Sequence, residues 1–197
     1  MDCRTGLETI NAMRAKVYAD RQLTGENLFI VWGYTTVVFF LLEFAALLLW
    51  NRAPWTYFVW MGIPVVGTPL MVHFLRKDLN RTHRISLNSN IILQMWIFIG
   101  GACFVGGWVF GFTGLFERCF CWLVGLLCSM GCFMTGVILR FSPKTICGII
   151  AAILSWAPLF VTHEEEWIWQ LPMTALSIIV SLIIPGHLFR QYVKKYE

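Results

Sequence analysis

Long apolar runs occupy most of the chain between residues 28 and 189, and short polar or charged segments separate them. A helix rising about 1.5 Å per residue needs about 20 apolar residues to cross a hydrocarbon core about 30 Å thick. Runs of roughly this length lie at 28–50, 55–75, 91–112, 120–139, 145–162 and 168–189. They are continuous rather than alternating, which favours helices over barrel strands. The pattern predicts an all-α bundle of six transmembrane helices. The fifth run is the shortest and contains Pro158, so it is the weakest candidate span.

The composition agrees with a membrane location. Hydrophobic residues make up 58% of the 197 residues and charged residues 13%, whereas soluble domains carry about 25% charged residues. With so few polar groups the chain cannot cover its apolar surface in water. The ten Trp residues suit a protein with two membrane–water interfaces.

In the membrane topology that these six spans predict, Lys and Arg residues are distributed unequally over the two sides of the membrane. Of the 15 in the chain, 13 fall on the side of the two termini, and only Arg52 and Arg118 fall on the other side. By the positive-inside rule, both termini and the basic tail 190–197 are cytoplasmic. The net charge of +4 then suits anionic lipid on the cytoplasmic side. We expect no nucleic-acid partner, because no connection is long enough to form a soluble domain. The candidate anionic-lipid contacts lie in the connection 76–90 and are Arg76, Lys77, Arg81 and Arg84.

The segment 1–27 ahead of the first span is predicted to be a short cytoplasmic amphipathic helix. Thr5 and Glu8 have capping-box spacing, and apolar residues follow at helical intervals. Two interpretations are open: the helix lies on the lipid headgroups, or it docks a cytosolic protein partner.

Glu43 is the only acidic residue within a predicted span, and Thr36 lies two turns earlier on the same helix face. A charged carboxylate at mid-membrane costs about 3 kcal/mol on insertion scales. Glu43 is therefore either a proton or cation site, or a neutral side chain hydrogen-bonded between helices. In the last span, Thr174, Ser177 and Ser181 share one face. They either line a polar path or hold neighbouring helices together.

The third span is rich in small residues. Two pairs have the small-xxx-small spacing that lets helices approach closely, and these are Ala102 with Gly106 and Gly107 with Gly111. This face either joins two copies in a homo-oligomer or packs within one bundle.

Candidate metal ligands are weak, and we expect no metal and no cofactor. Met130 and Met134 point away from the face of the fourth span that carries Cys128 and Cys132, so soft ligands do not converge there. His73 and His187 each lie within three residues of an arginine, which predicts interfacial positions rather than buried ligands. The acidic run 164–166 is interpreted as a cap for the last helix.

Three short segments of the sequence resemble those of a known group of proteins. They read FIVWGY at 29–34, WMGIPVVG at 60–67 and IIPGHL at 183–188, behind a short charged helix. With these pieces the chain resembles a group of small, uncharacterised, polytopic bacterial inner-membrane proteins of similar length. The resemblance implies several spans in the inner membrane and a cytoplasmic N-terminus, and it assigns no functional residue.

The favoured function is that of a regulatory or accessory membrane protein. A small oligomeric transporter or channel that uses Glu43 is the alternative. A lipid-modifying enzyme is weaker, because no nucleophile–base pair or acidic metal cluster is predicted at either interface, and no catalytic residue is assigned.

The predicted membrane topology is testable with reporter fusions. Fusions at Asn51, Glu117 and Glu165 should report the outside of the membrane, and fusions at Thr82 and after Glu197 the inside, because the positive-inside rule fixes the orientation. Opposite signals from the two termini would rule out an even number of spans.

Overall fold

The computed structural model describes residues 26–49, 58–59, 61–82, 87–113, 119–161 and 167–194, and these contain helices and turns but no strand. The predicted N-terminal helix lies outside these residues. The helices are α2 (Glu26–Leu49), α3 (Gly62–Thr82), α4 (Leu87–Thr113), α5 (Cys121–Ile138), α6 (Ser142–Leu154), α7 (Gln170–Ile178) and α8 (Ile184–Lys194). Two 3-10 turns, Ala157–Phe160 and Trp167–Trp169, flank the connection from α6 to α7. A π-helical segment, Ile179–Ile183, joins α7 to α8.

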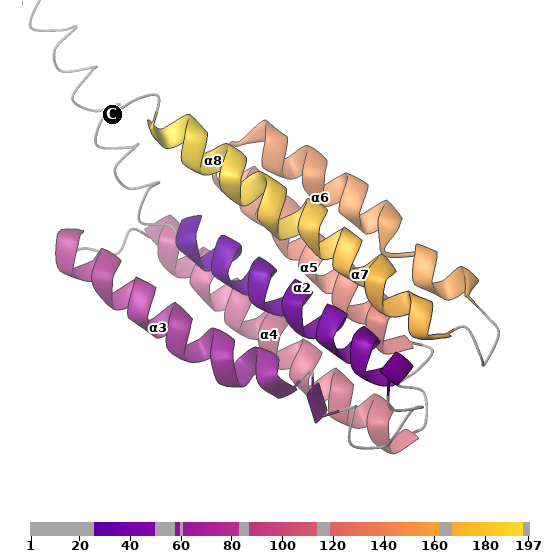
Figure 1. Ribbon diagram of the computed structural model, residues 1–197. Coiled ribbons are helices and arrows are strands. Elements are labelled where there is room, and N and C mark those ends of the chain that lie inside the picture. The colour runs from indigo at the N-terminus through magenta and orange to yellow at the C-terminus, as the bar shows by residue number, and fades with distance from the viewer. Residues whose placement is uncertain are drawn as a thin grey trace, which may run out of the picture.

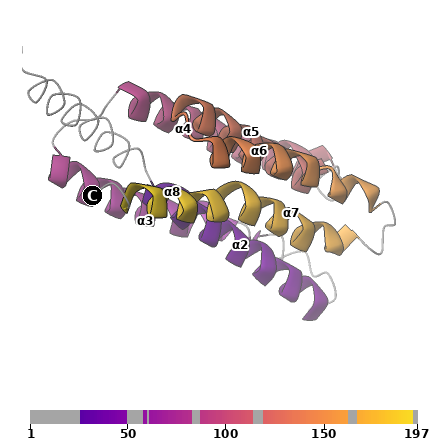
Figure 2. The ribbon, with the colours of Figure 1, turned by 90° about the horizontal axis from the view of Figure 1, so that it is seen from above.

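The helices lie side by side, and the chain reverses direction at each connection, so α2 begins and α8 ends at the same end of the bundle (Figure 1). We call this the basic end, because the exposed Arg76, Arg140 and Arg190 lie there. Figure 2 shows α4, α5 and α6 on one side of the bundle, with α2, α3 and the α7–α8 rod on the other. The layers meet where α7 packs against both α2 and α5.

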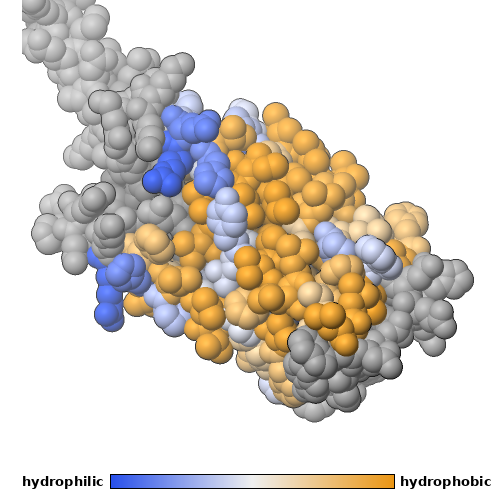
Figure 3. All heavy atoms as spheres, in the orientation of Figure 1, coloured by the Kyte–Doolittle hydropathy of each residue, from blue (hydrophilic) through white to orange (hydrophobic). Residues whose placement is uncertain are grey.

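Five of the helical segments are long and apolar enough to cross a membrane: Phe29–Leu49, Asn90–Phe110, Cys121–Ile138, Ser142–Phe160 and Gln170–Tyr192. Large apolar side chains cover the outside, among them Leu49, Phe98 and Ile153, which are 74%, 74% and 68% exposed. Figure 3 shows hydrophobic residues over most of the visible face and strongly hydrophilic ones near the basic end. A surface of this kind is expected where lipid replaces water as the solvent.

The second predicted span differs most from the structure. Phe58 and Val59 form a 3-10 turn, and α3 begins only at Gly62, so its apolar part is the shorter stretch Gly62–Phe74. Pro64 lies in the first turn of α3, where proline is tolerated. Pro69 lies inside the same helix, where its missing N–H removes one helical hydrogen bond. At its other end α3 continues through Arg76, Lys77 and Arg81. Much of the predicted connection 76–90 is therefore helix, and Arg84 lies outside the described residues.

The fifth span is continuous in direction but not in hydrogen bonding. Pro143 occupies the first turn of α6, and the α-helix ends at Leu154. A 3-10 turn that contains Pro158 then completes the stretch Ser142–Phe160. Pro158 has no backbone N–H to donate to an α-helical bond, so the chain tightens there instead of stopping.

The tightest helix contact joins α5 to α6. A Cβ built on Gly136 would lie 2.5 Å from the backbone nitrogen of Thr145, and one on Gly148 would lie 2.6 Å from that of Phe133. Only glycine permits backbones to approach this closely. Between these contacts, Arg140 adopts a left-handed φ of 51°. The amide of Phe141 donates to Gly136 O at 2.9 Å and that of Arg140 to Val137 O at 3.1 Å. These two bonds form a Schellman ending, where a residue other than glycine costs about 1 kcal/mol.

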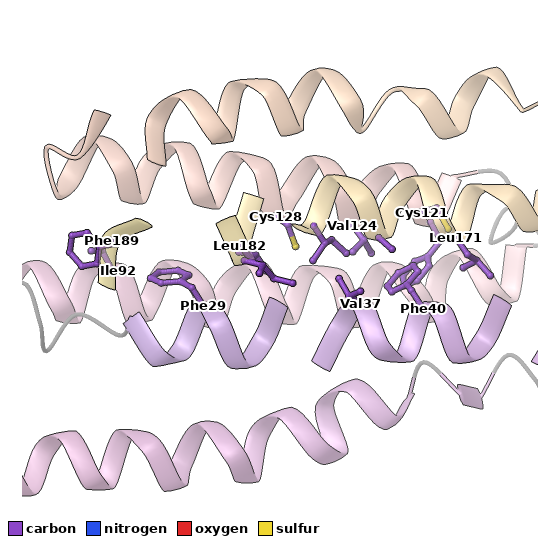
Figure 4. Close-up of a cluster of buried hydrophobic side chains, with 14 of the residues drawn as sticks. Phe29, Val37, Phe40, Ile92, Cys121, Val124, Cys128, Leu171, Leu182 and Phe189 are labelled. Atoms are coloured by element: carbon purple, nitrogen blue, oxygen red, sulfur yellow. The ribbon is translucent and has the colours of Figure 1, made fainter. Parts of the chain in front are cut away.

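The main apolar core lies where α2 faces α5 and α7. Phe29, Val37 and Phe40 of α2 point toward side chains of α5 and the last span, among them Val124 and Leu182 (Figure 4). Close backbone contact continues along the last span. A Cβ on Gly33 would lie 2.8 Å from Ile183 Cγ1 in the π-helical segment, and one on Gly186 would lie 2.8 Å from Ile30 Cγ1.

The small residues of α4 divide between packing and open surface. A Cβ on Gly106 would lie 2.8 Å from Leu123 Cδ2 of α5, and Gly107 is buried. Ala102 is half-buried, and Gly111 belongs to the last turns of α4. Gly106 thus contributes to packing within one bundle. The neighbouring Gly100 has nothing within 4 Å of a built Cβ.

These contacts predict opposite effects for two glycine substitutions. Gly148→Ala should lower stability by about 1–3 kcal/mol, because the added methyl group meets the backbone of α5. Gly100→Ala should leave stability unchanged or raise it by up to about 1 kcal/mol, since it gains helix propensity in open space. Thermal unfolding of both variants in one detergent measures the difference, and equal melting temperatures would contradict the close α5–α6 contact.

Candidate functional site

Glu43 is buried in the protein rather than exposed to lipid. It lies near the end of α2 opposite the basic end, and its side chain is 2% exposed. The apolar residues Phe40 and Leu47, each 1% exposed, lie one turn to either side. The α2 face that carries them packs against α7, and the ring of Phe44 lies 5.3 Å from that of Trp169.

Polar side chains of two other helices lie near this position. The thiol of Cys121 on α5 lies within electrostatic range of the Glu43 carboxyl and beside the Thr174 side chain. The Thr174 hydroxyl donates to the carbonyl of Gln170, one turn earlier on α7, at 2.8 Å. We call Glu43, Cys121, Thr174 and Gln170, which joins the group through its main chain, the Glu43 cluster. Figure 4 shows Cys121 close to Leu171, the residue after Gln170, and to Phe40 of α2.

Two oxygen atoms of the cluster lack a hydrogen bond within the described part of the chain. The Gln170 amide nitrogen donates to the carbonyl of Val161 at 3.3 Å, which fixes the orientation of the amide. Its oxygen Oε1 is buried without a donor, and so is Oε1 of Glu43. A desolvated acceptor without a partner costs about 1–3 kcal/mol. A proton on Glu43 removes the charge from this buried group, so the geometry favours a protonated carboxyl.

The other predicted polar residues are buried as well. Thr36 is 7% exposed, and Ser177 and Ser181 are 0% exposed. The Ser177 hydroxyl crosses to α6 and donates to Ala151 O at 2.9 Å, whereas that of Ser181 donates to Ile178 O at 3.3 Å. Thr174, Ser177 and Ser181 therefore bond to backbone carbonyls. Of the five predicted polar residues, Thr174 is the one that the structure links to Glu43. The Cys121 thiol lies beside Thr174 and within electrostatic range of the Glu43 carboxyl.

Sequence reasoning missed Gln170 and Lys144. Gln170 follows the Trp167–Trp169 turn, and a lone amide at the start of an apolar run is a weak signal. The predicted topology counts Lys144 among the 13 cytoplasmic Lys and Arg residues, yet its side chain is only 1% exposed. Its Nζ lies 3.2 Å from the ring centroid of Phe29, which is a cation–π contact between α6 and α2. No spacing rule links residues so far apart in the chain.

The histidines and cysteines form no metal centre in the residues described, where no group of three potential ligands converges. The ring of His187 bonds to the Tyr34 hydroxyl at 3.1 Å, and His73 is exposed on α3. Cys128 and Cys132 are buried free thiols. Met130 and Met134 are 55% and 47% exposed on the opposite face of α5, as the sequence predicts.

No protein-family model, no curated protein and no solved structure matches the chain. The assignment of a function therefore depends on the chemistry of the residues themselves.

The protonation of Glu43 is directly measurable. At neutral pH, infrared spectroscopy of the purified protein should show the C=O stretch of a protonated carboxyl, because no opposite charge among the described residues would balance an ionised, buried Glu43. Glu43→Gln should remove this band. The matched control Glu117→Gln, at an acid outside the predicted spans, should leave it in place. A wild-type spectrum without the band would show that Glu43 is ionised.

Proposed function

We propose that this chain is a regulatory or accessory protein of the bacterial inner membrane whose helix packing responds to the protonation of Glu43. In this proposal it has six spans and both termini in the cytoplasm. Two observations support six spans: the five long apolar segments, and the direction of α3 beside α2. The uneven distribution of Lys and Arg supports the cytoplasmic position of the termini.

The observation that carries the proposal is the pair of buried acceptors, Glu43 Oε1 and Gln170 Oε1, without hydrogen-bond donors in the described part of the chain. With a proton on Glu43, the contact between α2, α5 and α7 contains no net charge. Loss of that proton leaves a carboxylate in a low-dielectric contact, which is stable only if water enters or the helices separate. Protonation and packing are thus coupled.

The hydroxyls along the last span favour a regulatory protein over an open pore. Thr174 and Ser181 donate to carbonyls of their own span, and Ser177 donates to Ala151 O of α6, so all three hydroxyls are taken up by backbone groups. A regulatory role needs a recipient of the signal, which we expect to be a cytosolic protein at the basic end or a second copy of the chain.

A small oligomeric transporter or channel is the second candidate. The π-helical segment Ile179–Ile183 favours it, because π-helical turns inside longer helices are frequent at functional sites. Ser181 lies within this segment, on the same span as Thr174 and Ser177. A transporter would move protons or small cations between these hydroxyls and Glu43.

The proposal predicts pH-dependent packing around Glu43. As the pH rises, the protection of α2 and α7 amides in the full-length protein, corrected for the base-catalysed intrinsic exchange rate at each pH, should decrease, because an ionised Glu43 loosens their contact. The corrected protection in Glu43→Gln should not depend on pH. Exchange that responds identically to pH in wild type and Glu43→Gln would refute the proposal.

Proteoliposomes distinguish the two candidate functions. A transporter should dissipate an imposed proton or cation gradient, and Glu43→Gln should abolish that flux. A regulatory protein should leave the gradient intact while showing the pH-dependent exchange.

A further inference from the structure

The turn between α5 and α6 places an arginine where the backbone favours glycine. Arg140 has a left-handed φ of 51° and an exposed side chain. The hydrogen bonds of the turn are made by main-chain atoms of Gly136, Val137, Arg140 and Phe141. Glycine would adopt this conformation without the steric penalty of a Cβ. The turn itself does not need arginine, so the role of Arg140 lies in its side chain.

Aromatic contacts join this turn to the end of α8. The ring of Phe141 lies 5.1 Å from that of Phe189 and 5.3 Å from that of Tyr192. Arg190 follows Phe189 and is exposed. Arg140 and Arg190 therefore flank one aromatic contact, from two segments far apart in the sequence.

Among the side chains that the structure describes, the charges near this surface are positive. Glu43 is the only acidic residue whose side chain the structure describes, and it lies about 21 Å along α2 from Phe29 at the basic end. Lys144, whose Nζ lies over the Phe29 ring, adds a further positive charge below the turn. Low-dielectric surroundings strengthen the attraction of such a cluster for an anion.

An exposed apolar side chain lies near Arg140. Val137 precedes it by three residues, at the end of α5, and is 51% exposed. A ligand that fits this surface has an anionic group at the membrane interface and hydrocarbon beside it. Guanidinium groups bind phosphate oxygens in a bidentate manner, which makes arginine well suited to the anionic part.

We propose that Arg140 and Arg190 form a binding site for a phosphate group, supplied by the headgroup of an anionic phospholipid whose acyl chains lie along α5. This site is separate from the basic residues at the end of α3, and it does not depend on the role of Glu43.

The test titrates the full-length protein in detergent with phosphatidylglycerol, and with phosphatidylcholine as the zwitterionic comparison. Arg140→Gly and Arg190→Gln should each weaken phosphatidylglycerol binding about fivefold, as expected for one lost cation near the lipid surface. Arg52→Gln, which removes a cation from the connection between α2 and α3, should leave binding unchanged. Arg140→Gly should also keep or raise the melting temperature, because glycine suits the turn.

Unchanged phosphatidylglycerol affinity in Arg140→Gly would overturn the proposal. If that variant does not fold, Arg190→Gln provides the test, since it leaves the turn between α5 and α6 intact. Unchanged phosphatidylglycerol affinity in Arg190→Gln would also overturn the proposal. Inorganic phosphate supplied alone distinguishes the source of the phosphate group. Binding as tight as that of phosphatidylglycerol, and lost in the same variants, would show a site for free phosphate and overturn the lipid assignment.

Discussion

Hydrocarbon accepts and donates no hydrogen bonds, and this constraint governs each irregular part of the bundle. Backbone groups that leave α-helical geometry within a span must find partners in the protein. Where α6 ends, the amides of Trp156, Leu159 and Val161 donate to carbonyls three residues back. Side chains supply other donors: Gln170 reaches the carbonyl of Val161, and Ser177 reaches that of Ala151. Gln170 and Ser177 of the last span thus donate hydrogen bonds to carbonyls of the α6 region, near the point where the α-helix of the fifth span ends.

The Glu43 cluster departs from this rule of satisfaction. The Gln170 amide donates through its nitrogen to the carbonyl of Val161, and its oxygen has no donor in the described part of the chain. Oε1 of Glu43 has none either. In our proposal a change in the charge of Glu43 acts on the packing of α2 against α5 and α7, because Cys121 and Thr174 lie beside it.

The two ends of the bundle handle charge differently. At the basic end Arg76, Arg140 and Arg190 are exposed, and Lys144 is buried with its Nζ over the Phe29 ring, whose face attracts a cation. Toward the opposite end, a buried acid lies near a thiol and a hydroxyl. The anionic-lipid site and the proton-responsive cluster that we propose therefore lie at separate places.

The apolar runs by themselves determined the helical class, the positions of five long spans and the separation of Met130 and Met134 from the cysteine face, because helix length and periodicity are local properties. Tertiary structure alone decided that Cys121 and Thr174 lie beside Glu43, that Lys144 is buried against Phe29, and that Gly136 and Gly148 rather than Gly100 lie against the backbone of a neighbouring helix. Each of these depends on which helices become neighbours and how they are rotated. Rotation is set by the summed packing of all the helices, to which no single segment of the sequence gives access.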